Sequence, residues 1–493
     1  MAKPPGTSRR THPRHPAGVP HRRLVSLACG LCLLTGPALR VQHAPLRLHF
    51  RPPDQDLGDV HPFFHEGECF LYYLRPGTFR SALVRSCDLV RWTPAPVTHG
   101  PAKPDDWFEP WFVLGVFRDG EVYRSFYGTR RGRMVCSVSR DLLHWSCAPK
   151  AFSVPPADYY HQRRDPFAFW IPQMKQFGCV MTTWIPGRPK ATGGALSLAT
   201  SPDLKQWKDH GPIVDPGDMG PPECPQMFPL GKRWHLLTSI NEERCVGRPV
   251  YWTAPSPLGP WSREPDGALD GKDLCAAQVA FDGRTPLLFG WVPLTPARPG
   301  RQHWGGHLAL PRELTVLPDG SLATRLPKRL RETLANLHWH TVPDFQTTSD
   351  PHRIEGQWGD LAAVFELHMP PSAEAVRVRI DPLCEVVLQR RRLRILDADG
   401  QAWSERDARI PSDRAVTVRL FVERDIVETF VAERFSLVAR VPPRDGPRRM
   451  SVRSAGPGAR IRAMRIGNLT QERTPSGPPA AASGGRNGPV PAR

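Results

Sequence analysis

Three acidic residues far apart in the chain share one setting, because each stands beside a turn signal and an apolar, strand-like run. They are Asp59, Asp165 and Glu223. Taken singly, such residues are ordinary turn or loop-capping residues. If the fold brings them together, they suit the cleavage of a glycosidic bond. One carboxylate attacks or activates water, and one carboxylic acid protonates the leaving oxygen. Arg164 precedes Asp165 and would keep its carboxylate ionised, because a neighbouring opposite charge lowers a carboxyl pKa.

A sequence repeat indicates the elements that would position these acids. The pattern Ser-x-Asp-Leu-x-x-Trp occurs at 86–92, 139–145 and 201–207, and a decayed copy follows at 256–261. Near-regular repetition at this period is typical of bladed or stacked folds. Aromatic and β-branched runs lie between the copies, at 68–74, 122–127, 178–184, 234–240 and 286–292. We therefore predict an all-β fold, with a five-bladed β-propeller whose inner strands meet at a central funnel. The repeat residues themselves would form turns and pack between blades.

The chain divides into five predicted parts. Residues 1–44 form a leader, 45–325 the propeller, and 326–339 a helical linker. Residues 340–469 alternate between apolar and polar positions with period 2, which predicts a C-terminal β-sandwich. Residues 470–493 are rich in Pro, Gly, Ala and Ser, and this composition predicts a disordered tail.

Composition excludes several classes of function. A chain of 493 residues is too long for one ordinary hydrophobic core, so two or more domains are expected. The net charge is +18. Much of this charge lies in the basic leader, and the remaining arginines are scattered among acids, so we predict no nucleic-acid partner. The 11 cysteines form no paired metal motif outside the apolar stretch around Cys29 and Cys32, so we predict no metal site.

The sequence of the predicted leader indicates the cellular compartment of the protein. A basic flank, an apolar run at 24–34 and small residues after it are typical of a secretory signal. The run is too short to cross a bilayer as a stable helix, so no membrane span is expected. We predict export to the periplasm or the extracellular space, and a cytoplasmic location remains the alternative. The oligomeric state stays open.

Several motifs, in this order and spacing, resemble glycoside hydrolase family 32, the invertase, levanase and inulinase group. The resemblance covers about residues 50 to 469. The motifs are Gly58–Gly67, Arg164-Asp165-Pro166, Glu223-Cys224, Gly271–Gln278, Phe289-Gly290-Trp291, Trp304–Leu308 with Pro311–Leu314, and Ile426–Phe430.

The resemblance implies a role for each matching residue. Asp59 would be the nucleophile and Glu223 the general acid and then base, while Asp165 would bind hydroxyls and stabilise the transition state. The reaction would retain configuration through a fructosyl-enzyme, without metal or organic cofactor. The carbohydrate substrate would be a fructoside. The predicted substrate-binding residues are Arg164, Trp291, Trp304 and His61.

Departures from the family pattern keep other functions open. The first motif of the family usually reads Asn-Asp-Pro-Asn-Gly, whereas Gly58 and Val60 flank Asp59 here and His61 follows. One alternative is a related arabinan- or xylan-type glycosidase of the same clan. Another is a catalytically silent carbohydrate-binding propeller, and a third is an interaction propeller in which the acids do not converge.

Overall fold

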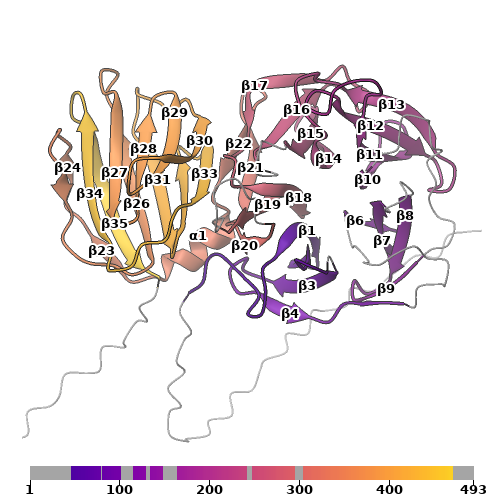
Figure 1. Cartoon of the computed structure of the whole chain (residues 1–493), viewed down its shortest axis with the longest axis horizontal. Coiled ribbons are helices and arrows are strands. Elements are labelled where there is room, and N and C mark those ends of the chain that lie inside the picture. The colour runs from indigo at the N-terminus through magenta and orange to yellow at the C-terminus, as the bar shows by residue number, and fades with distance from the viewer. Residues whose placement is uncertain are drawn as a thin grey trace, which may run out of the picture. The chain divides into compact units, whose positions relative to one another are not determined.

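The structure, a computed structural model, describes residues 46–78, 80–100, 115–128, 134–147, 164–240, 247–294 and 304–469. The predicted leader 1–44 and tail 470–493 lie outside these residues. The predicted all-β class is confirmed: the described part holds one helix, α1 (Lys328–Ala335), among many strands (Figure 1). Within this part of the chain, no helix has the length and apolar character needed to cross a membrane.

Five sheets precede α1, each of four or five strands. The first joins β1 (Gly58–His65), β2 (Glu68–Leu74), β3 (Ser81–Ser86) and β4 (Thr93–Ala95). The second has the order β5 (Thr98–His99), β9 (His144–Cys147), β8 (Met134–Ser139), β7 (Val122–Gly128) and β6 (Val116–Asp119). The third joins β10 (Arg164–Ile171), β11 (Gln176–Trp184), β12 (Gly194–Ser201) and β13 (Lys208–Val214).

The fourth sheet joins β14 (Glu223–Leu230), β15 (Arg233–Ser239), β16 (Pro249–Ala254) and β17 (Ser262–Ala268). The fifth joins β18 (Cys275–Asp282), β19 (Thr285–Pro293), β21 (Arg312–Val316) and β22 (Leu322–Arg325), and β20 (Gly306–Leu308) also pairs with β19. The five strand-like runs predicted from the sequence are confirmed as β2, β7, β11, β15 and β19.

The five sheets follow one another around a common centre (Figure 1). The strands nearest this centre are β1, β6, β10, β14 and β18, and each contacts the next. The last of them, β18, contacts β1, so the series of contacts returns to its start. Side chains carried at the same point of these strands are therefore brought together from positions far apart in the sequence.

The Ser-x-Asp-Leu-x-x-Trp repeat forms turns, as predicted. The Asp141 carboxylate accepts hydrogen bonds from the amides of Leu143 and His144 at 2.9 and 2.8 Å. The preceding Ser139 hydroxyl accepts one from the Leu142 amide at 3.0 Å. The Trp145 indole, 1% exposed, donates to the Leu142 carbonyl at 3.3 Å. These hydrogen bonds satisfy the backbone of a tight turn, which is a structural role.

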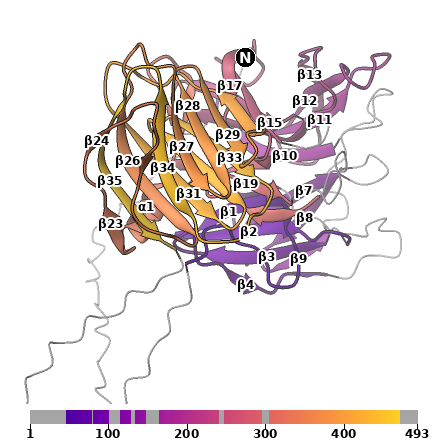
Figure 2. The ribbon, with the colours of Figure 1, turned by 60° about the vertical axis from the view of Figure 1, so that its left-hand side comes forward.

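Two larger antiparallel sheets follow α1 and enclose one apolar core (Figure 2). One has the order β23 (Trp339–Thr341), β35 (Arg460–Asn468), β26 (Leu361–His368), β31 (Val416–Glu423), β32 (Ile426–Val431) and β33 (Phe435–Arg440), with β24 (Phe345–Gln346) also on β35. The other has the order β25 (His352–Arg353), β34 (Arg449–Ala455), β27 (Ala375–Asp381), β28 (Cys384–Gln389), β29 (Arg392–Asp397) and β30 (Ala402–Asp407).

A buried ionic network joins the fifth sheet to the strands that follow α1. The Arg312 guanidinium on β21 holds Asp270 through two bonds of 3.2 and 3.1 Å and also contacts Glu428 on β32. The His49 ring lies between Glu423 and Glu428, at 3.0 and 2.9 Å. Burial alone would lower the pKa of His49, but its bonds to the two carboxylates outweigh this and raise it to about 9. His49 is therefore a buried cation at neutral pH.

Candidate active site

Four of the central strands begin with the same irregularity. On each of them one residue pairs with the neighbouring strand, the next two form a bulge, and pairing resumes at the fourth. The second residue has a positive φ in every case, which is uncommon for residues with a side chain. These residues are Asp59 (38°), Asp165 (52°), Cys224 (52°) and Ala276 (44°). Gly115, directly before β6, has a φ of 36°. Bulges re-aim side chains, and such strained positions cluster at functional sites.

This shared bulge explains how distant acids converge. Asp59 and Asp165 occupy the equivalent bulge position on β1 and β10. Glu223 stands one residue earlier, at the paired position of β14 that Arg164 occupies on β10. The three carboxylates thus come from the same end of three of the central strands, of which β10 and β14 are neighbours.

Arg164 ties two of the acids together. Its Nη2 donates to Glu223 Oε1 at 2.6 Å, and its Nε lies 3.9 Å from Asp165 Oδ2. The Cys224 amide donates to Asp165 Oδ2 at 3.1 Å. Asp165 therefore accepts a hydrogen bond from a backbone amide and lies beside the Arg164 guanidinium.

The carboxylates perturb one another's titration. Burial raises the pKa of Asp59 to about 7, and the charges of Glu223 and Asp165 act in the same direction. The Trp291 N–H, 3.4 Å from Asp59 Oδ1, and the Arg164 charge oppose this rise. Burial also raises the pKa of Glu223, against the effect of Arg164. Asp59 and Glu223 are thus two carboxyl groups whose pKa values burial raises, as acid–base catalysis requires.

Trp291 and Trp304 form an aromatic wall beside Asp59. Trp291 on β19 is fully buried, and its ring centre lies 5.9 Å from that of Trp304 at an angle of 63°. The Trp304 ring also lies against the backbone of Gly58, the residue before Asp59. The sequence singled out both tryptophans but gave no sign of this contact with Gly58, because Gly58 begins β1 and Trp304 lies far away in sequence, just before β20.

His61 lies on β1, two residues beyond Asp59, and is 5% exposed. Burial lowers its pKa to about 3 despite the nearby Gln278 side chain, so the ring is neutral. The structure thus gathers Asp59, Asp165, Glu223, Arg164, Trp291 and Trp304 through the contacts above. Among the contacts that it describes, none joins His61 to the three acids.

Two glutamines without an assigned role in the sequence brace the strands that carry the site. Gln278 on β18 donates to the Cys224 carbonyl on β14 at 3.1 Å, and Gln226 donates to the Val279 carbonyl at 3.2 Å. Both follow the bulge of their strand at the point where pairing resumes. That shared position is the signal that links them, and it is visible only once the strands are aligned on their bulges.

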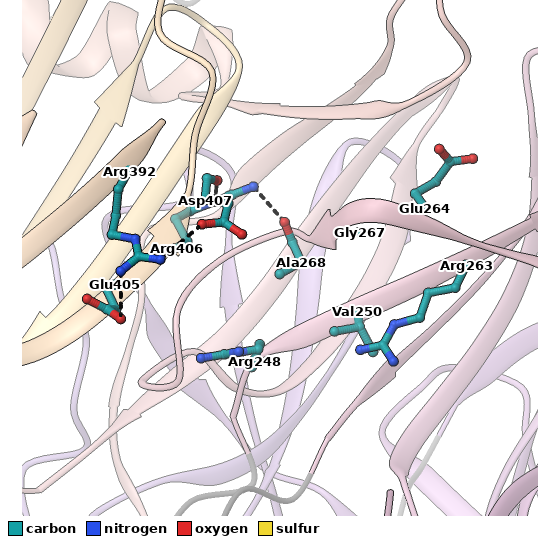
Figure 3. A pocket seen from close by; sticks show the side chains of 10 residues that line it. All are labelled: Arg248, Val250, Arg263, Glu264, Gly267, Ala268, Arg392, Glu405, Arg406 and Asp407. Atoms are coloured by element: carbon teal, nitrogen blue, oxygen red, sulfur yellow. Dashed lines mark hydrogen bonds and ion pairs between the residues drawn. The ribbon is translucent and has the colours of Figure 1, made fainter. Parts of the chain in front are cut away.

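A cavity of about 360 Å³ lies away from the acids, where β16 and β17 face β29 and β30. Figure 3 shows its lining residues: Arg248, Val250, Arg263, Glu264, Gly267, Ala268, Arg392, Glu405, Arg406 and Asp407. Arg406 donates to the Ala268 carbonyl at 2.5 Å, so this cavity sits at the joint between the two groups of sheets. Across the described ranges, no group of three or more His, Cys, Asp or Glu side chains is placed to hold a metal ion.

Comparison with known proteins agrees with this architecture. Residues 49–325 match the model of the glycosyl hydrolases family 32 N-terminal domain. Fructan 1-exohydrolase IIa from Cichorium intybus superimposes with a TM-score of 0.67 at 15% identity, covering 87% of this chain and 97% of that chain. A β-fructofuranosidase of Bombyx mori gives 0.66 at 18% identity, covering 86% and 93%. Exo-inulinase from Aspergillus awamori gives 0.65 at 17%, covering 86% and 98%. At these identities the likeness to the solved structures is one of fold.

Proposed function

Because the chain belongs to glycosyl hydrolase family 32, we propose that it is a retaining glycosidase that cleaves β-fructofuranosyl linkages. The observation that carries this proposal is the convergence of Asp59, Asp165 and Glu223 around Arg164 from three central strands. Asp59 is the nucleophile, Glu223 the acid and base, and Asp165 the ionised group that stabilises positive charge on the sugar ring.

In the same proposal, residues 45–325 form a five-bladed propeller, 326–339 a helical linker and 340–469 a β-sandwich. The cyclic contacts of β1, β6, β10, β14 and β18 support five blades around one axis. The common core of the two later sheets supports the sandwich. The leader 1–44 directs export, and the apolar run at 24–34 is the support for this.

In the first step, the ionised Asp59 carboxylate attacks the anomeric carbon of the fructosyl unit. Glu223 gives its proton to the glycosidic oxygen, so the bond to the leaving sugar breaks as the bond to Asp59 forms. In the reactive form of the site, the Glu223 carboxyl is protonated and the Asp59 carboxylate is negatively charged. The Trp291 N–H favours that arrangement by donating to Asp59, and the raised pKa of Glu223 keeps the proton available.

In the second step, the ionised Glu223 takes a proton from water, and the resulting hydroxide attacks the anomeric carbon. The bond to Asp59 breaks, and Asp59 returns to its ionised form. Asp165 and Arg164 take no part in these proton transfers, and the Cys224 amide and the Arg164 guanidinium hold the Asp165 carboxylate in place. Each displacement inverts the anomeric carbon, so the product keeps the starting configuration.

The substrate proposal is a neutral fructoside such as sucrose or a levan- or inulin-type fructan. Related structures support this class: a variant of the Bombyx mori enzyme is in complex with sucrose, and a variant of the Cichorium intybus enzyme is in complex with 1-kestose. The alternatives are a related arabinan- or xylan-type glycosidase and a silent carbohydrate-binding protein. The two carboxyl groups with raised pKa values favour catalysis over silent binding.

The test is to incubate the full chain with sucrose, 1-kestose, levan, inulin and arabinan and to measure released monosaccharide. Glu223→Gln should lower kcat on the fructosides by about 10²–10⁴-fold, because it removes the acid–base group. Glu332→Gln is the control, since Glu332 lies exposed on α1 in an ion pair of 3.6 Å with Lys328, and it should leave kcat unchanged.

Methanol as acceptor distinguishes the stereochemical course. A retaining enzyme transfers the fructosyl unit to give the methyl β-fructofuranoside. The α product would overturn the covalent mechanism. Turnover of arabinan but no fructoside would support the clan relative, and binding of fructosides without turnover by the unaltered chain would support the silent binder.

A further inference from the structure

Gly58 stands next to the nucleophile position, and the ring of Trp304 fills the space that a side chain there would need. A Cβ atom built on Gly58 would lie 2.6, 2.8 and 2.9 Å from the Cη2, Cζ2 and Cζ3 atoms of Trp304. Real Cβ atoms essentially never approach other heavy atoms below 3.0 Å. A methyl group at Gly58 would therefore have to displace the indole or the backbone.

The backbone at Gly58 does not itself require glycine. Gly58 is not among the glycines with positive φ, so its backbone is open to residues with side chains. The Trp304 ring alone therefore excludes a side chain at this position. The reason for the glycine lies in Trp304, which precedes β20 and is distant in sequence, and the two residues form one packing unit.

This unit reaches Asp59 from two directions. Through the chain, Gly58 is bonded directly to Asp59, whose positive φ of 38° fixes where its carboxylate points. Through space, Trp304 packs at 5.9 Å against Trp291, and Trp291 donates to Asp59 Oδ1 at 3.4 Å. A shift of the Trp304 ring would therefore move both the backbone before Asp59 and the donor on its side chain.

We propose that Trp304 is a positioning and specificity residue, which sets Asp59 through Gly58 and Trp291 and makes the wall of the sugar site beside Asp59 aromatic. This inference rests on the proposed function and adds to it a residue that positions the nucleophile. With no side chain at Gly58, position 58 offers the sugar no side-chain hydrogen-bonding group. The flat indole suits a fructosyl unit that presents an apolar C–H face to this wall.

The test is a double-mutant cycle of wild type, Gly58→Ala, Trp304→Ala and the double variant, with kcat/KM and Tm measured for each. Gly58→Ala should lower kcat/KM by about 100-fold, because an ångström of misplacement at the reacting group costs about that much. It should also lower Tm. In the Trp304→Ala background the same change should cost less than about 3-fold in kcat/KM, with almost no further fall in Tm, because the clash is gone.

Two further measurements separate positioning from general packing. Gly100→Ala is the matched control, since its Cβ would meet Ser146 Cβ at an ordinary 3.6 Å on a backbone without positive φ. It should leave kcat/KM and Tm unchanged. Trp304→Ala should move the acid limb of the kcat/KM profile to lower pH, because water then reaches Asp59 and burial is the main cause of its raised pKa.

Equal effects of Gly58→Ala in the two backgrounds, or no effect in either, would overturn the coupling. An unmoved acid limb would reduce Trp304 to a packing residue. If the wild type cleaves no fructoside, the proposed function fails, and the catalytic part of this inference fails with it. The Tm cycle needs no substrate and still decides whether Trp304 is what keeps position 58 free of a side chain.

Discussion

Replacing Arg312 by methionine should strongly destabilise the protein while leaving the chemistry of the site intact. The Arg312 side chain is 0% exposed and holds Asp270 through two bonds, at 3.2 and 3.1 Å. It also contacts Glu428, and its guanidinium carbon lies 5.7 Å from the Phe430 ring centre. Methionine keeps much of the apolar stem but removes the charge, so two buried carboxylates lose their common cation.

The magnitude follows from what those carboxylates retain. Asp270 still accepts from the Ser436 hydroxyl at 2.6 Å and the Val438 amide at 2.9 Å, and Glu428 still accepts from His49 at 2.9 Å. Breaking a buried ion pair by removing one partner costs about 3–5 kcal/mol, and the remaining donors place this case near the lower end. With an unfolding entropy of about 2.1 cal/mol/K per residue, a loss of about 3 kcal/mol corresponds to a fall in Tm of roughly 3 °C for a chain of this length.

The assay is calorimetric unfolding at pH 7, paired with kcat on the best substrate well below the lower Tm. Arg392→Met is the matched control, because Arg392 is 51% exposed and meets Glu405 and Asp407 only at 3.8 and 3.7 Å. It should change the free energy of unfolding by less than about 0.5 kcal/mol. Adding Glu428→Gln to Arg312→Met should restore part of the loss, because it neutralises one stranded carboxylate. If Arg312→Met is as mild as Arg392→Met, the network does not hold the two groups of sheets together.

Three further predictions concern protons and hydrogen bonds. His49 has a raised pKa of about 9, so its contribution to stability is complete below pH 6.5 and is lost as pH rises through 9. Urea unfolding should show the difference in free energy of unfolding between wild type and His49→Gln narrowing across that range. A constant difference would refute the prediction. Asp59 has a raised pKa of about 7, so the wild type loses stability between about pH 4 and 7, because the carboxyl of the unfolded chain gives up its proton first. Asp59→Asn should match the wild-type Tm near pH 4 and exceed it at pH 8. A Tm of the variant below that of the wild type at pH 8 would contradict the burial argument. Trp291→Phe keeps the packing but removes the N–H that favours ionised Asp59. Its kcat/KM should therefore fall about 10-fold, and the acid limb of the kcat/KM profile should move to higher pH. An acid limb that stays in place would exclude this hydrogen bond from the mechanism.

Local patterns in the sequence predicted the elements of the fold that depend on neighbouring residues. The β-branched and aromatic runs predicted strands such as β2 and β11, which pair with the central strands β1 and β10. The Ser-Asp pairs predicted the turns. Both signals act over a few residues, so they are legible without knowing the pairing. The acids at 59, 165 and 223 were found in the same way, from their turn residues and the strands that follow.

The bulges could not be predicted, because a bulge is a relation between two strands. Nothing in the local sequence says that Asp59, Cys224 and Ala276 share a positive φ, since their side chains have little in common. The contact of Trp304 with Gly58 and the bonds of Arg312 to Asp270 and Glu428 belong to the same class. Each joins residues that are far apart in the sequence, and only the assembled fold brings them within reach.

The charge of the site gives a physical reason to prefer a neutral substrate over an anionic one. Three carboxylates surround one guanidinium, and the mutual repulsion helps raise the pKa of Asp59 to about 7. An anionic substrate placed beside them would add to that repulsion and push further protons onto groups that must ionise to react. A fructosyl unit enters neutral and gains positive charge only as its glycosidic bond breaks. The excess negative charge is thus costly in the empty site and favourable in the transition state, which is the difference that catalysis requires.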